Sequence, residues 1–227
     1  MKVTFLGHAG FLIETGDCRL LIDPFLDGNP LAVQSSDQVE ADYILLTHGH
    51  SDHLGDALPI ASRCGSTIIA PFELATYCQK KGADVHPMHI GGGFNFPFGR
   101  VKLTQAFHGS AIGEEMLAGG NPCGFILELE DKVIYHAGDT GLFGDMQLIG
   151  ELYDLDLAML PIGDNFVMGI DDALRAAEFI RARAIIPMHY GTFEVIDQDP
   201  KLFVEGLQAM ELDTEAIVLA PGEDYNL

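Results

Sequence analysis

Short apolar runs recur along the chain, and most are bounded by glycine, proline, aspartate or asparagine. Runs of about four to eight residues that are rich in valine, isoleucine and leucine are typical of buried strands. The pattern predicts strands over Val3–Leu6, Phe11–Glu14, Arg19–Ile22, Tyr43–Leu46, Thr67–Ala70, Val101–Phe107, Gly124–Leu129, Val133–Tyr135, Leu157–Leu160, Ala184–Ile186 and Ala216–Leu219.

Longer stretches between the later runs carry the start and stop signals of helices. Pro71–Lys81 begins with proline and is followed by Gly82, which are common first and terminating residues. Asp171–Ala182 opens with two acidic residues, which the positive end of a helix favours. Pro200–Met210 follows Asp199, a good N-cap residue. We predict a helix over each of these ranges.

The order of the elements indicates the fold class. Strands come first, then strands and helices alternate, and this order is repeated in the second half of the chain. Such an arrangement is typical of an α/β protein with two packed sheets and helices outside. The 227 residues contain no linker or low-complexity tract, which fits one domain over 1–227. Gly91–Gly93 and Gly119–Pro122 are predicted surface loops.

Composition and charge exclude several classes of partner. The chain has 34 acidic and 12 basic residues and a net charge of −22. Such a surface repels phosphate groups, so we expect no nucleic-acid partner and no binding to anionic membranes. No apolar run reaches the ~20 residues of a membrane-spanning helix, and the start lacks a signal peptide's apolar core. The four cysteines form no C-x-x-C pair. We expect a cytoplasmic protein, monomeric or a homo-oligomer.

The segment His48–His53 carries the chemistry of this chain and reads H-x-H-x-D-H. His48 and His50 are two residues apart, so their imidazoles point the same way in an extended segment. Asp52 and His53 follow where the chain turns toward a helix, which aims them at a second point nearby. The arrangement suits two adjacent metal ions better than one.

Other candidate ligands follow predicted strands elsewhere in the chain. His108 ends the run that begins at Val101, Asp139 follows Val133–Tyr135, and His189 follows Ala184–Ile186. The ends of strands gather at one edge of a sheet, so distant residues can converge there.

These motifs resemble the metallo-β-lactamase superfamily over nearly the whole chain. Further motifs narrow the resemblance to a group of small metal-dependent hydrolases related to the ascorbate-phosphate lactonases: Gly7–Phe11, Leu160–Phe166 and Pro187–Tyr190. The resemblance implies an αββα sandwich of two mixed β-sheets flanked by helices, with a dinuclear metal site. It implies a first metal held by His48, His50 and His108, a second held by Asp52, His53 and His189, and Asp139 bridging both.

The comparison also shows departures from other members. Drug-hydrolysing members place cysteine or another residue where this chain has Asp139, and a carboxylate there is the pattern of hydrolases with two bridged metals. The nucleases that process transfer RNA share H-x-H-x-D-H but carry a long exosite arm, and this chain has no insertion large or basic enough to form one.

The expected chemistry follows from this ligand set. Imidazole and carboxylate suit two divalent ions, Zn²⁺ above all, although Mn²⁺, Fe²⁺ and Ni²⁺ bind such ligands too. A hydroxide between ions ~3.5–4 Å apart would attack the substrate. Asp52 would orient it, and His8, on a turn after the first strand, would contact the substrate or protonate the leaving group.

The predicted function is hydrolysis of an ester, lactone or related bond in a small-molecule substrate. Two alternatives are a phosphodiesterase or nuclease, and a metal-binding protein without enzymatic activity. Among the remaining polar residues, His136 is predicted to be structural, His86 and His89 to lie in loops, and Asp164 and Asn165 are further candidates to face the site.

Overall fold

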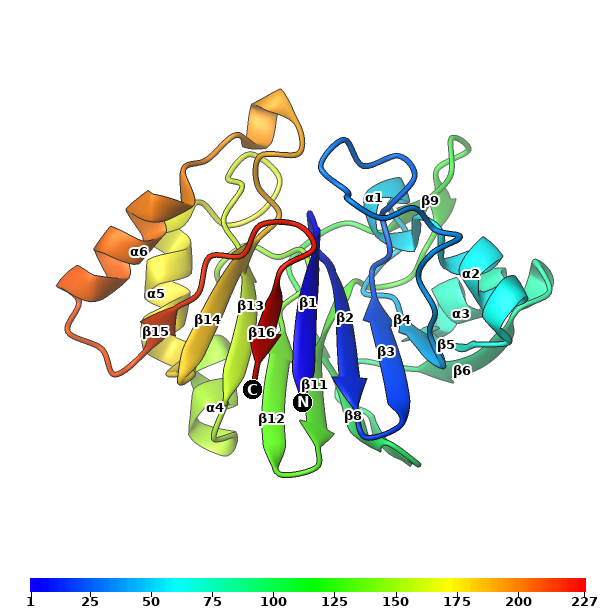
Figure 1. Ribbon diagram of the computed structural model, residues 1–227, viewed down its shortest axis with the longest axis horizontal. Coiled ribbons are helices and arrows are strands. Elements are labelled where there is room, and N and C mark those ends of the chain that lie inside the picture. Colours follow the sequence, from blue (N-terminus) through cyan, green and yellow to red (C-terminus); the bar gives the residue numbers. More distant parts are fainter.

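Two seven-stranded sheets pack face to face at the centre of the molecule (Figure 1). The computed structural model describes residues 1–227. The first sheet has the strand order β16-β1-β2-β3-β4-β5-β6. Its strands are β1 (Lys2–Gly7), β2 (Gly10–Thr15), β3 (Cys18–Ile22), β4 (Tyr43–Leu45), β5 (Thr67–Pro71), β6 (Asp84–Met88) and β16 (Asp224–Asn226).

The second sheet has the order β15-β14-β13-β12-β11-β8-β7. Its strands are β7 (Gly93–Phe96), β8 (Gly99–Gln105), β11 (Cys123–Leu129), β12 (Lys132–His136), β13 (Leu157–Pro161), β14 (Ala184–Met188) and β15 (Glu215–Ala216). A separate short hairpin joins β9 (Ala111–Ile112) to β10 (Leu117–Ala118).

Helices cover the outer face of each sheet. The first sheet carries α1 (Ser51–Leu54), α2 (Ala57–Cys64) and α3 (Phe72–Lys80), on the right of Figure 1. The second sheet carries α4 (Met146–Leu152), α5 (Ile170–Ile180) and α6 (Pro200–Ala209), on the left, and a single 3-10 turn, η1 (Glu194–Ile196), precedes α6. None of these helices combines the length and the apolar character that a bilayer crossing requires.

Three apolar clusters hold the layers together. The central one lies between the sheets and includes Ile13 and Phe125, both fully buried. The outer clusters join each sheet to its helices, for example through Leu74 of α3 and Phe203 of α6. Each such side chain contributes about 1.5–3 kcal/mol when it is fully buried. The expected αββα sandwich of two mixed sheets is confirmed.

The strand directions place the candidate ligands at one edge of the sandwich. Strands β3 to β6 are parallel, and so are β12 to β14. Their carboxyl ends therefore share one edge, at the top of Figure 1, which we call the rim. Residues at the rim follow β1, β4, β8, β12 and β14, and they are His8, His48, His108, Asp139 and His189.

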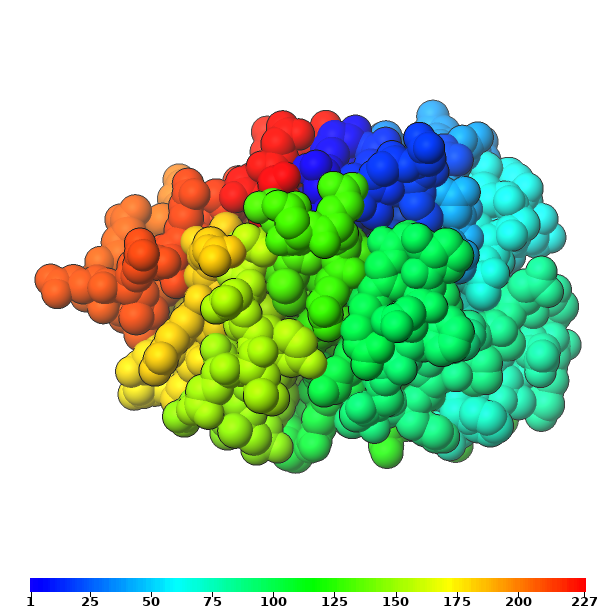
Figure 2. All heavy atoms as spheres, turned by 90° about the horizontal axis from the view of Figure 1, so that it is seen from below, coloured from blue at the N-terminus to red at the C-terminus, as the bar shows by residue number.

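The two ends of the chain meet in the first sheet. β16 pairs antiparallel with β1, and Val3 lies opposite Tyr225. Figure 2, which views the molecule from below, shows the C-terminal residues in red against the N-terminal residues in blue. The base, the edge opposite the rim where β1, β8 and β12 begin, faces this view.

The predicted helices are confirmed to within about two residues, and most of the predicted strands are present. The pattern missed β6, β7, β16, the hairpin β9–β10 and the short helices α2 and α4. The strand predicted over Ala216–Leu219 is shifted, because β15 covers only Glu215–Ala216. β6 and β7 lie at sheet edges, where proline and exposed residues are tolerated, so they lack a buried strand's pattern.

Two loop predictions were also wrong in part. His86 was predicted to lie in a loop, but it belongs to β6. Gly93, predicted to lie in a surface loop with Gly91, begins β7.

Candidate metal centre

The H-x-H-x-D-H segment spans the passage from β4 to α1. The extended chain after β4 directs His48 and His50 to one point, where His48 Nε2 lies 2.9 Å from His50 Nδ1. His108, which follows β8, reaches the same point, with its Nε2 3.3 Å from His50 Nδ1. Three imidazole nitrogens therefore converge closely enough to bind one cation.

Gly49 is required by the close approach of the β9–β10 hairpin. A Cβ atom at this position would lie 2.6 Å from Ile112 Cγ1, well inside van der Waals contact. The backbone N–H of Gly49 donates a hydrogen bond to Ser110 Oγ across 3.2 Å. The hairpin thus holds the segment that carries His48 and His50.

Asp139 stands at the centre of the cluster, on the turn that follows β12. Its Oδ2 lies 2.9 Å from His189 Nε2, 3.2 Å from His53 Nε2 and 3.6 Å from His108 Nε2. Burial raises the pKa of Asp139, but the neighbouring His53 and His189 lower it well below its usual value. Asp139 is therefore a carboxylate that several imidazoles share.

His189 and His8 tie the two sheets together at the rim. Both have the left-handed backbone conformation, with φ of 57° and 58°. The N–H of His189 donates to the carbonyl oxygen of His8 across 2.6 Å, and the two rings lie 4.0 Å apart between centroids. Non-glycine residues adopt such a φ at a cost of about 1–2 kcal/mol, and such strain clusters at functional sites.

His8 lies behind Asp52, not over the rim as a free imidazole. Its side chain is fully buried, Nε2 lies 3.1 Å from Asp52 Oδ2, and Nδ1 lies 2.9 Å from Thr192 Oγ1. Burial lowers the pKa of His8 to about 4, so the ring is neutral at physiological pH. Both ring nitrogens already have partners, whereas the sequence led us to expect that His8 would contact the substrate or protonate the leaving group.

Asp52 is the partly exposed carboxylate of the site, with 25% of its side chain accessible. Its Oδ2 lies 4.0 Å from Nε2 of both His53 and His189. Burial raises the pKa of Asp52, but the hydrogen bond with His8 and the charge on His53 outweigh this effect and lower it. Asp52 is therefore ionised and borders a second convergence point, shared with His8, His53 and His189.

Asp23 is a residue of the candidate site that the sequence reasoning missed. It is fully buried after β3, and its Oδ2 accepts a hydrogen bond from His53 Nδ1 across 2.7 Å. The backbone N–H of Thr47 donates to Oδ1 across 2.8 Å, and the Thr47 hydroxyl donates to Oδ2. Burial lowers the pKa of His53, but Asp139 and Asp23 raise it well above its usual value. An acidic residue directly after a predicted strand was the available signal.

The buried polar atoms of the site fit a metal ion. His53 Nε2, Asp139 Oδ1 and both ring nitrogens of His189 are buried without a hydrogen-bond partner. Buried polar atoms in proteins are nearly always paired, so such a group of orphans needs an explanation. Imidazole nitrogens and carboxylate oxygens are ligands for divalent ions, and a cation among them would satisfy His53 Nε2, Asp139 Oδ1 and His189 Nε2.

The site opens into a cavity of about 210 Å³. Its walls are formed by His50, Asp52, His108, Asp139, His189 and Phe166. Phe166 was not among the predicted site residues. Its neighbours Asp164 and Asn165, which were candidates to face the site, are exposed and do not line the cavity.

His136 is the last residue of β12 and does not belong to any of the groups of converging ligands. Its Nε2–H donates to the carbonyl oxygen of Ala9 across 3.0 Å, and its Nδ1 accepts from the N–H of Gly138 across 3.1 Å. The bond to Ala9 links the two sheets next to Asp139, in keeping with the predicted structural role.

The fold and this cluster define the class of protein. Residues 18–190 match the beta-lactamase superfamily domain, so the chain belongs to the beta-lactamase superfamily. Within it, the chain is 52% identical over 230 residues to a "UPF0173 metal-dependent hydrolase" of Pelotomaculum thermopropionicum, covering 100% of both chains. It is 56% identical over 211 residues to the metal-dependent hydrolase YtkL of Bacillus subtilis, covering 91% of this chain and 93% of that one.

Solved structures agree with this assignment. Igni18, a metallo hydrolase from the archaeon Ignicoccus hospitalis, superposes with a TM-score of 0.90 at 35% identity, covering 100% of this chain and 98% of that one. An isothiocyanate hydrolase from Delia radicum gut bacteria superposes with a TM-score of 0.79 at 21% identity, covering 100% and 99%, and shares the fold. The chain is therefore a metal-dependent hydrolase of this superfamily. This finding excludes the alternative of a metal-binding protein without enzymatic activity.

Proposed function

We propose that the chain hydrolyses an ester, lactone or related bond of a small molecule, using two divalent metal ions at the rim. The observation that carries this proposal is the convergence of eight histidine and aspartate side chains from both sheets. Seven of them are the proposed ligands, and one of these seven is the partly unpartnered carboxylate of Asp139. The relatives named metal-dependent hydrolases support it.

The proposed ligand sets follow the two convergence points. His48, His50 and His108 would hold one ion, and Asp52, His53 and His189 the other. Asp139 would bridge them, because its Oδ2 lies within 3.6 Å of imidazoles from both sets. His8 is left out of the ligand sets, because its Nε2 is directed at Asp52 and its Nδ1 at Thr192.

The residues around the ions would orient the attacking water, accept its proton and position the ligands. Divalent ions here would lower the pKa of a bound water and polarise the oxygen of the scissile group. Asp52, ionised and partly exposed, would orient that water and accept a proton. His8 would hold Asp52 in place, and Asp23 would keep the proton of His53 on Nδ1, leaving Nε2 free for metal binding.

Metal content and turnover test this proposal together. The protein, purified without chelator and supplied with Zn²⁺, is expected to contain about two metal equivalents by elemental analysis, and parallel loading with Mn²⁺, Fe²⁺ and Ni²⁺ would rank the metals by turnover. The substrate panel should include an ester, a lactone, a thioester and a phosphodiester. A reproducible metal content near zero after resupply would refute the dinuclear site, and turnover of the phosphodiester alone would favour the phosphodiesterase alternative.

The proposal also covers location and partners. With a net charge of −22, the protein has no general electrostatic attraction to phosphates, so we propose that it binds neither nucleic acid nor anionic membranes. We also propose a cytoplasmic location, as expected from the sequence. Micromolar binding to transfer RNA or duplex DNA at ~0.15 M salt would contradict this proposal and favour the alternative function of a nuclease.

A further inference from the structure

The cavity at the rim has one apolar wall and no lysine or arginine. Apart from Phe166, every lining residue belongs to the proposed ligand sets. Imidazole binds metal as the neutral base, so these histidines would carry no charge of their own. No side chain of the lining is therefore left to form an ion pair with a phosphate or carboxylate group of a substrate.

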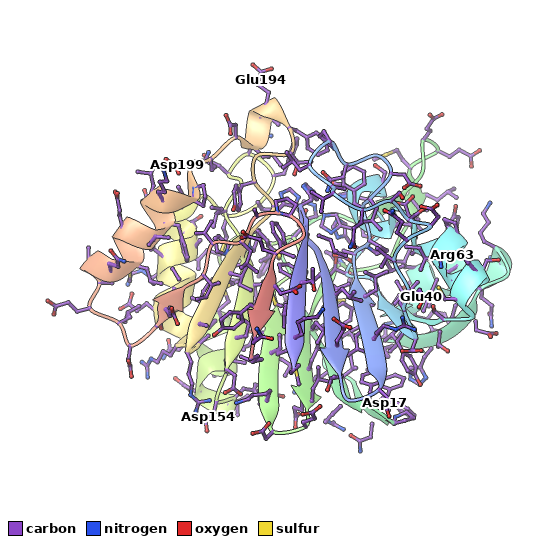
Figure 3. All side chains as sticks on the ribbon, viewed as in Figure 1. Asp17, Glu40, Arg63, Asp154, Glu194 and Asp199 are labelled. Carbon is purple, nitrogen blue, oxygen red and sulfur yellow. The ribbon has the colours of Figure 1, made fainter.

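The basic residues of the strands stand at the base instead. They are found at or next to the starts of β1, β3, β8, β12 and β14, and they are Lys2, Arg19, Arg100, Lys132 and Arg183. A strand rises about 3.3 Å per residue, so these positions lie roughly 15–25 Å from the rim. Figure 3 labels Asp17 and Asp154 at this end, and Glu194 beyond the rim. Salt screens charges over about 8 Å at physiological ionic strength, so these cations exert little attraction at the cavity.

The other basic residues are also engaged or directed elsewhere. The guanidinium of Arg63 donates to the carbonyl oxygens of Ser36 and Val39, on the side of the molecule where Figure 3 labels it near Glu40. Lys80 and Lys81 line a different hollow, between α3 and the β9–β10 hairpin. Lys102, on β8, lines another hollow beside α4, where its Nζ lies over the ring of Tyr153. The rest lie on α5 or α6 or directly beside α5, on the outer layer: Arg175, Arg181 and Lys201.

Phe166 lines the cavity from a loop that backbone hydrogen bonds hold in place. The N–H of Met168, which is 1% exposed, donates to the carbonyl oxygen of Thr140 across 3.0 Å. The N–H of Asp164 donates to the carbonyl oxygen of Met168 across 3.0 Å, which closes the turn around Phe166. The Phe166 side chain remains 56% exposed in this position. An apolar group of a substrate that packed against the Phe166 ring would bury its exposed surface, and this burial would favour binding.

We propose that the substrate is an uncharged carboxylic ester or lactone whose apolar group packs against Phe166. This inference rests on the proposed function and narrows it. In the reaction, water adds to the carbonyl carbon, the acyl C–O bond breaks, and the departing alkoxide takes a proton. The products are a carboxylic acid and an alcohol, or one hydroxy acid from a lactone. Apart from the metal ions, which the scissile carbonyl would occupy, a phosphate or carboxylate substituent would find no cationic side chain in the lining.

A pair of esters that differ only in terminal charge tests the charge preference. The metal-loaded protein is expected to hydrolyse 4-nitrophenyl hexanoate with a kcat/KM at least about tenfold above that for 4-nitrophenyl hydrogen adipate, after correction for spontaneous hydrolysis. Calorimetric binding of hexanohydroxamate and of its carboxylate-terminated analogue gives a second readout that needs no turnover. The neutral hydroxamate is expected to bind at least about tenfold more tightly.

Variants of Phe166 test its role. Phe166→Ala should lower kcat/KM for the hexanoate ester about tenfold while changing that for the acetate ester less than about threefold, and Phe166→Leu should retain most of the hexanoate activity. Phe166→Lys should raise the rate for the adipate ester relative to the hexanoate ester. Val195→Ala is a matched control, because Val195 is 58% exposed on the 3-10 turn near the rim but does not line the cavity.

The outcomes separate this inference from the proposed function. If metal-loaded protein hydrolyses no ester or lactone, the proposed function fails and the inference fails with it. If it hydrolyses them but treats the adipate ester as well as or better than the hexanoate ester, the charge preference is wrong. If Phe166→Ala affects the acetate and hexanoate esters equally, the apolar contact with Phe166 is overturned.

Discussion

The carboxylate of Asp23 accepts a hydrogen bond from Nδ1 of His53 across 2.7 Å, and both side chains are fully buried. The bond holds a proton on Nδ1 of His53 and directs its unpartnered Nε2 toward Asp139. A carboxylate behind a ligating histidine makes the imidazole more basic and sets the orientation of the ring. Asp23 does not line the cavity, but it orients a proposed metal ligand, His53, from the side opposite the cavity.

Asp23→Asn should weaken metal binding without unfolding the protein. Asp23 accepts three hydrogen bonds, and the amide oxygen of asparagine cannot replace both carboxylate oxygens toward these donors. We expect metal affinity to fall about 10–100-fold, as is typical when such outer partners are removed. Competition with a chromogenic chelator measures this change.

The matched control for Asp23 is Asp42→Asn. Asp42 also accepts a backbone hydrogen bond, from Arg19 across 2.8 Å, but it is exposed and lies near the base. Equal metal affinity in the two variants and the unmodified protein would show that Asp23 does not orient the ligand.

Removal of Asp139 should affect both proposed metal positions. Its Oδ2 contacts imidazoles of both ligand sets, so Asp139→Ala is expected to lower the content of both metals and to abolish hydrolysis. His108→Ala should weaken mainly the first position and His189→Ala mainly the second. Elemental analysis after dialysis distinguishes these patterns, and an Asp139→Ala protein that keeps two tightly bound ions would refute the bridge.

His8 should act on turnover through Asp52, without holding metal. His8→Ala removes the partner 3.1 Å from Asp52 Oδ2, and we expect metal content to persist while kcat/KM falls ~10²-fold. His8→Gln should recover part of the loss, because its amide N–H can donate to Asp52. Both variants carry the same backbone strain at φ 58°, so their difference reports on the hydrogen bond. Loss of metal in His8→Ala would instead make His8 a ligand.

Gly138 should be essential for the turn that presents Asp139. Its φ is +64°, and a Cβ atom there would lie 2.5 Å from the carbonyl oxygen of Cys123. We expect Gly138→Ala to cost about 2–4 kcal/mol of stability and to lower Tm by about 5–10 °C. Gly141→Ala is the control on the other side of Asp139, since its Cβ would have only the Phe107 oxygen nearby, at 4.0 Å. Similar melting temperatures for the two variants in a calorimetric scan would contradict this account.

Much of the candidate site could be read from local patterns. The spacing of His48, His50, Asp52 and His53 is contained in six consecutive residues, so their potential as metal ligands could be recognised without the rest of the fold. His108, Asp139 and His189 each follow an apolar run, and parallel strands bring such positions to one edge. The buried strands were predictable for the same reason, because burial on both faces leaves a continuous apolar run.

The tertiary structure decided the features that depend on contacts between distant segments. Asp23 became part of the site because β3 lies beside β4, and His8 turned inward because the carbonyl oxygen of His8 bonds to the N–H of His189 in the other sheet. Phe166 reached the cavity through a loop pinned to Thr140. A sequence states which residues can bind metal, carry charge or pack in a core, whereas burial and the partner of each polar atom are set by chain segments far away. The sequence by itself therefore determined the ligand chemistry and the fold class. Only the packing of the two sheets decided that Asp23 and His8 contact the proposed ligands and that Phe166 lines the cavity.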